Sequence, residues 1–115
     1  MGTGNKDPGE RAHETAEAIR RESAALRDSA ASLRRSAEVF RTSAAALRRE
    51  ADASPDPHEA AVLRNQAELK TQHATALDDH AFIMNAEADS AQLKADMAES
   101  RALIARAPPG RTEPE

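Results

Sequence analysis

Small and large apolar residues alternate with a seven-residue period through the first half of the chain. From residue 15 to residue 49 the sequence divides into five consecutive blocks, TAEAIRR, ESAALRD, SAASLRR, SAEVFRT and SAAALRR. In each block the second residue is Ala or Ser, the fifth is large and apolar, and the sixth is Arg. A seven-residue apolar period predicts an α-helix that supercoils with another helix.

The second half of the chain repeats this pattern with alanine alone at the small position. Every seventh residue from Ala60 to Ala102 is alanine. The residues three positions further on are mostly larger, namely Leu63, Lys70, Leu77, Met84, Ala91, Ala98 and Ala105. We call the small set of each helix its small stripe and the other set its large stripe, and we expect both stripes in the core.

The segment between these halves carries the signals of a helix end and a helix start. Pro55 and Pro57 interrupt the repeat, Asp56 can cap the next helix, Pro57 suits its first position, and Glu59 can complete a capping box. We therefore predict a first helix over residues 10–53, a turn over 54–57 and a second helix over 57–106. We expect residues 1–9 and 107–115 to be disordered tails around a hairpin domain over 10–106.

The short turn predicts that the two helices lie antiparallel. The predicted fold class is all-α, an antiparallel two-helix coiled-coil hairpin with alanine-rich heptads. In the register that we favour, large side chains face alanines, as in Phe40 with Ala74 and Leu33 with Ala81. The same register predicts three polar pairs along the flanks: Arg34 with Asp78, His13 with Glu99, and Glu22 with Lys94.

The second helix has more apolar surface than one helix contact can use. A further apolar set lies outside both stripes, and we predict that it forms an interaction surface: Val62, Leu69, Ile83, Met97, Ile104 and Phe82. Two copies of the hairpin can bury this set by dimerising into a four-helix bundle, or a helical partner protein can cover it. Either arrangement makes the chain an oligomerisation or adaptor module.

Composition supports the expectation of a partner. Of the 45 residues counted as hydrophobic 27 are alanine, and the chain has two Phe but no Trp or Tyr. A single chain therefore has little large apolar surface with which to offset the entropy of folding. The absence of cysteine excludes disulfides, thiolate metal sites and cysteine nucleophiles.

One polar line on the second helix is the best candidate for hidden chemistry. His73, His80 and Glu87 are spaced by seven and can ligate a metal or respond to pH. Residues seven apart on a helix are separated by about 10.5 Å, so these three cannot share an ion within one chain, whereas a symmetric dimer could bring two copies together. The main prediction is no metal and no cofactor, and a small metal-binding or pH-responsive bundle is the alternative.

Charge favours contact between the halves over nucleic-acid binding. Residues 19–49 contain eight Arg and three acids, whereas residues 65–99 contain two Lys and seven acids. The Arg line at residues 20, 27, 34, 41 and 48 lacks interleaved aromatic residues, so we expect no nucleic-acid partner. Thirteen Arg against three Lys, with abundant Ala, is typical of a GC-rich bacterial genome.

Motifs of enzymes and of membrane proteins are absent from the sequence. It contains no Gly-rich phosphate loop, no apolar run of about 18 to 20 residues and no signal-peptide pattern. We therefore expect a cytoplasmic protein without enzymatic activity or membrane contact.

Overall fold

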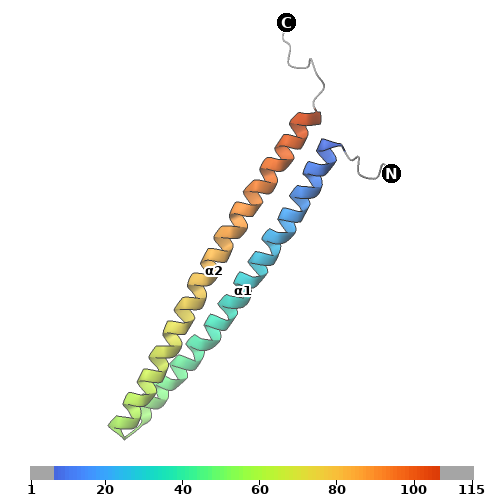
Figure 1. Ribbon diagram of the computed structural model, residues 1–115. Helices are drawn as coiled ribbons and strands as arrows, with labels where there is room; N and C mark the ends of the chain where they lie inside the picture. The colour runs from blue at the N-terminus through green and yellow to red at the C-terminus, as the bar shows by residue number, and fades with distance from the viewer. Residues whose placement is uncertain (1–6, 107–115) are drawn as a thin grey trace. The chain divides into compact units, whose positions relative to one another are not determined.

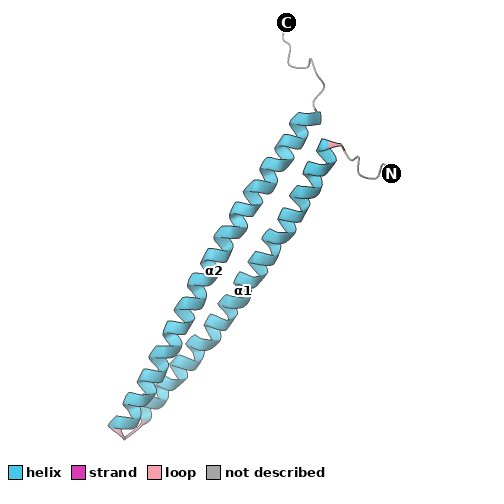
Figure 2. Ribbon diagram, viewed as in Figure 1, coloured by secondary structure: helices cyan, strands magenta, loops and turns pink. Residues whose placement is uncertain are grey.

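The computed structural model describes residues 7–106, which form two long helices packed against each other as a hairpin (Figures 1 and 2). Helix α1 spans Pro8–Ala53 and helix α2 spans Pro57–Arg106, with no strand in this range. The all-helical hairpin predicted from the sequence is therefore confirmed. The predicted tails are residues 1–9 and 107–115; residues 1–6 and 107–115 lie outside the described residues, whereas Pro8 and Gly9 belong to α1.

Helix α1 begins two residues earlier than the predicted residue 10, because Asp7 caps it. The backbone N–H of Glu10 donates to Asp7 Oδ1 at 2.7 Å, and the N–H of Arg11 donates to the Asp7 carbonyl oxygen at 3.1 Å. Pro8 then occupies the first helical position, where its missing N–H removes no helical hydrogen bond.

Asp56 caps α2 as predicted, but the capping box does not close. The N–H of His58 donates to Asp56 Oδ1 at 2.9 Å. The Asp56 N–H donates instead to Ser54 Oγ at 3.3 Å, and the Ser54 hydroxyl donates to Glu59 Oε2 at 3.4 Å. Glu59 is therefore connected to Asp56 through the Ser54 hydroxyl and not by a hydrogen bond from the Asp56 N–H.

The chain divides into two compact units, each containing a segment of both helices. Among the described residues, unit 1 comprises 7–26 and 86–106, and unit 2 comprises Arg27–Asn85. We describe each unit separately.

In unit 2 the small stripes form the core and the large stripes lie at its edge. The buried residues are all alanines: Ala30, Ala37, Ala44, Ala51, Ala60, Ala67, Ala74 and Ala81. The large-stripe residues are only half-buried: Leu33, Phe40, Leu47, Leu63, Lys70, Leu77 and Met84. The expectation that both stripes are in the core is therefore correct for the alanines and wrong for the larger side chains.

Unit 1 has the same arrangement with one polar residue in its core. Gly9, Ala16, Ala88, Ala95 and Ala102 are buried, and Ser23 takes the remaining small position. The Ser23 hydroxyl donates to the carbonyl oxygen of Ala88 on the facing helix at 3.0 Å. This bond satisfies a group whose burial would otherwise be costly.

Side-chain size explains why the two stripes differ in burial. Alanine methyl groups allow two helix backbones to approach closely, and no large side chain fits between backbones at that separation. The larger residues therefore lie beside the alanine contact and keep one edge in solvent. Among the described residues the largest fully buried side chain is that of Ser23.

Candidate functional sites

Unit 2 exposes large apolar side chains on both of its helix segments. Leu69 is 65% exposed and Phe82 is 69% exposed, although both are large enough to contribute strongly to a core. Val62 and Ile83 on α2 and Val39 on α1 are also exposed. Exposed apolar groups that recur along one helix are typical of a surface that contacts another molecule.

Unit 1 exposes a second apolar set, which lies entirely on α2. Its members are Leu93, Met97, Leu103 and Ile104. All six residues of the predicted interaction surface are therefore exposed in one unit or the other. Val39 on α1 and Leu93 and Leu103 on α2, which the sequence pattern also places on apolar faces, are exposed as well.

His73 packs against an aromatic ring of the neighbouring helix. Its imidazole stacks on Phe40 with ring centroids 4.3 Å apart and an interplanar angle of 15°. Lys70 Nζ lies 5.6 Å from the centroid of the same ring, within the range of a cation–π contact. His73 thus has a packing contact within unit 2, although it is exposed, as are His80 and Glu87.

Arg41 is the partner of Asp78 in unit 2, so the predicted pairing of Arg34 with Asp78 is wrong. The Arg41 guanidinium donates to Asp78 Oδ2, and Arg48 donates to Thr71 Oγ1 at 2.9 Å. Helical side chains lean toward the N-terminus of their own helix. In an antiparallel pair the two side chains lean toward each other, so the partner lies one heptad beyond the residue directly opposite.

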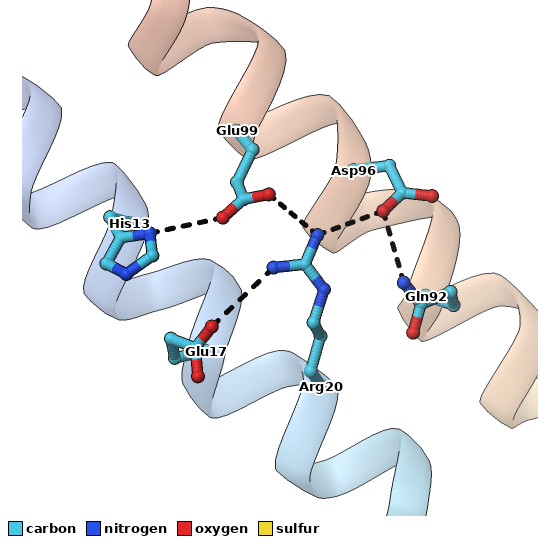
Figure 3. A network of polar contacts seen from close by, with 6 residues as sticks. All are labelled: His13, Glu17, Arg20, Gln92, Asp96 and Glu99. Atoms are coloured by element: carbon cyan, nitrogen blue, oxygen red, sulfur yellow. Dashed lines mark hydrogen bonds and ion pairs between the residues drawn. The ribbon is translucent and has the colours of Figure 1, made fainter.

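The densest group of polar side chains lies in unit 1 around Arg20 (Figure 3). The Arg20 guanidinium donates to Glu99 Oε1 at 2.8 Å and to Asp96 Oδ1 at 3.0 Å, and it lies 3.8 Å from Glu17 Oε2. His13 Nδ1 lies 3.1 Å from Glu99 Oε2, which confirms the predicted proximity of these two residues. Arg20 therefore links both helices of the unit.

Arg20 and Glu99 stabilise each other's charged forms. The hydrogen bond from Arg20 holds the pKa of Glu99 below its ordinary value, against the opposing effect of partial burial. Hydrogen bonds to Glu99 and Asp96 raise the pKa of Arg20. At neutral pH the carboxylate is therefore ionised and held in place by a cation.

Three possible metal ligands meet in this cluster. One ligand atom each from His13, Glu17 and Glu99 lies within 4.8 Å of the other two. Within residues 7–106 this is the group of three or more such side chains that the fold brings together, and it does not include His73, His80 or Glu87. The sequence prediction missed Glu17, although His13 and Glu17 are four residues apart and so share a helix face.

For the third predicted polar pair, Glu22 with Lys94, the structure shows that the two residues line one surface depression. Glu22 and Lys94 line the same open depression of unit 1, together with Ile19, Leu26 and Glu87. Their proximity matches the predicted antiparallel register for this unit.

Comparison with known proteins identifies no relative for this chain. No family model, no curated protein and no solved structure matches it. Separately, neither described helix contains a segment long and apolar enough to cross a bilayer.

Proposed function

We propose that this chain is a self-association module whose exposed apolar residues on α2 dock on a second copy of the chain, giving a four-helix bundle of coiled-coil helices. The observation that supports this proposal most strongly is the distribution of apolar side chains. Eight of the nine large apolar residues that are exposed in the described part lie on α2, whereas the buried positions are occupied by alanine, one serine and one glycine.

The energetics of burial favour a partner. Burying a Leu, Ile or Phe side chain contributes about 1.5 to 3 kcal/mol, whereas an alanine methyl contributes only about 0.8 kcal/mol. In a single chain, therefore, the side chains that would contribute most on burial remain exposed to solvent. A second copy that covers Leu69, Phe82 and Ile83 recovers that contribution.

Charge complementarity favours a second copy over an unrelated protein. In unit 2 the α1 segment carries six Arg and four acids, and the α2 segment carries four acids, one Arg and one Lys, so the two segments have opposite net charges. A two-fold axis that sets α1 of one copy beside α2 of the other brings opposite charges together twice. Such rim charges select the orientation, while the apolar contact supplies the affinity.

Sedimentation equilibrium tests the proposal directly. The wild-type chain should sediment at twice its mass of 12.3 kDa, and Leu69→Asp combined with Ile83→Asp should give the single-chain mass with helical circular dichroism retained. Asn65→Asp combined with Gln72→Asp adds the same two charges to exposed polar positions of α2 and should leave the dimer intact. A wild-type chain that stays at 12.3 kDa at about 100 μM, a concentration well above the Kd of a stable dimer, would contradict self-association.

A further inference from the structure

The arrangement of His13, Glu17 and Glu99 in unit 1 fits a single small cation. His13 and Glu17 lie one helical turn apart on α1, and Glu99 approaches them from α2 (Figure 3). Their ligand atoms lie within 4.8 Å of one another. Two ligands of one zinc ion, each bonded at about 2.0 to 2.2 Å, are separated by at most about 4.4 Å, so small side-chain rotations would place all three around one ion. We propose that these three residues form a binding site for a divalent first-row transition cation such as Zn²⁺, within one chain and independent of self-association.

The donor set indicates a transition cation in preference to Ca²⁺ or Mg²⁺. Imidazole nitrogen binds zinc, nickel and cobalt well, whereas calcium and magnesium prefer oxygen ligands alone. The carboxylates of Glu17 and Glu99 together supply the two negative charges that balance a divalent ion. Three protein ligands leave one tetrahedral position for water.

The surroundings of the cluster leave room for that fourth ligand. A cavity of about 170 Å³ opens beside the pair of His13 and Glu99, and Ala102 and Leu103 form the rest of its lining. A cation seated between His13 and Glu99 would therefore face open space on this side. The small side chain of Ala102 keeps the approach clear.

Arg20 acts as a positioning residue for Glu99 in this proposal. Its guanidinium binds Oε1 of the Glu99 carboxylate, while Oε2 of the same carboxylate faces His13. The same guanidinium nitrogen, Nη2, also donates to Asp96 Oδ1 at 3.0 Å, and Gln92 donates to Asp96 Oδ1 at 3.1 Å. Outer hydrogen bonds of this kind orient metal ligands and keep them charged. The longer contact of Arg20 with Glu17, at 3.8 Å, is the one that an incoming ion would replace.

Isothermal titration of the untagged full chain with ZnCl₂ tests the site. We expect one zinc ion per chain, and His13→Ala or Glu99→Gln should each weaken binding by about tenfold or more. Asp96→Asn keeps the three ligands but removes a charge that holds Arg20, so it should weaken binding less than the loss of a ligand does. His58→Ala, which removes an exposed histidine near the turn, should retain wild-type affinity.

Cobalt provides a second measurement that a purely structural role of these residues would not change. Co²⁺ bound by His13 should show visible absorption that His13→Ala alters and His58→Ala does not. Absence of zinc binding to the wild-type chain would overturn the proposal. Zinc binding that survives His13→Ala but is lost in the double variant His73→Ala, His80→Ala would also overturn it. A stoichiometry of one ion per two chains would do the same, since both results assign the ion to the other histidines. The dimer-breaking variant Leu69→Asp with Ile83→Asp should bind zinc normally, which separates this site from the proposed function.

Discussion

At the residue scale, alanine determines how this protein packs. Each buried alanine contributes one methyl group, and its small size is what permits the facing helix to lie close. The half-buried Phe40 illustrates the consequence, because its ring lies at the edge of the contact, stacked on His73 instead of inserted between the helices. An increase in side-chain volume at the small positions is therefore the change that this core should tolerate least.

Substituting a buried alanine by leucine should destabilise the hairpin. Ala74 is fully buried, so Ala74→Leu should lower the free energy of unfolding by about 1 to 3 kcal/mol through overpacking. Ala31→Leu, at an exposed position of α1, makes the same chemical change without a clash and should cost less than about 0.5 kcal/mol. Urea denaturation at one protein concentration measures both variants, and equal stabilities would contradict the close contact at Ala74.

The ion pair of Glu99 with Arg20 should make stability depend on acid pH. The pKa of Glu99 is lower in the folded chain than its ordinary value of 4.5, so its contribution is fully present above that pH. Stability should then be lost as the pH falls through the lower folded-state pKa, because protonation removes the negative charge that Arg20 binds.

Thermal melts at about pH 6, above the ordinary pKa of Glu99, and at a pH low enough to protonate Glu99 in the folded chain check the expectation. Glu99→Gln lacks the titrating group, so its melting temperature should fall less between these two conditions than that of the wild-type chain. An equal fall in both proteins would show that Glu99 has no such role.

At the element scale, aspartate caps define where both helices start. Asp7 and Asp56 each accept a hydrogen bond from a backbone N–H of the first helical turn, and a proline follows each of them. Carboxylates at this place satisfy free N–H groups and interact favourably with the positive end of the helix dipole. The turn between the helices is therefore specified by three adjacent residues, Pro55, Asp56 and Pro57.

Removing the cap of α2 should weaken the hairpin at its turn. Asp56→Ala deletes the acceptor of the His58 N–H and should cost about 1 kcal/mol of unfolding free energy. Asp79→Ala, at an exposed site within α2, removes the same group without uncapping a helix and should not lower stability by more than about 0.5 kcal/mol. Chemical denaturation compares them, and a neutral Asp56→Ala would show that Ser54 and Glu59 suffice to cap α2.

At the scale of the whole molecule, each unit pairs an alanine core with exposed large residues. This inversion of the usual distribution is the reason for proposing self-association, because in most folded domains the large apolar side chains supply the stability. Both units show it, with Leu69 and Phe82 exposed in unit 2 and Leu103 and Ile104 exposed in unit 1. The proposed zinc site concerns unit 1 alone and needs no second copy.

The sequence by itself determined the helices, the turn and which small residues face inward. These properties depend on local chemistry and on helical periodicity: the seven-residue spacing of Ala60 to Ala102 places every one of these alanines on one side of α2, and the Asp-Pro pair starts that helix. The exposure of Val62, Leu69 and Met97 follows from the same periodicity, because they lie on the opposite side from the alanines.

Only the tertiary structure decided which distant side chains meet. The sequence paired Asp78 with Arg34, and the lean of both side chains along antiparallel helices assigns it to Arg41 instead. The proximity of His13, Glu17 and Arg20 to Glu99 depends on the axial offset of the two helices and on the length of each side chain. Spacing along one chain fixes directions around a helix axis, but contacts across the interface depend on the separation and offset of two axes, which no local pattern contains.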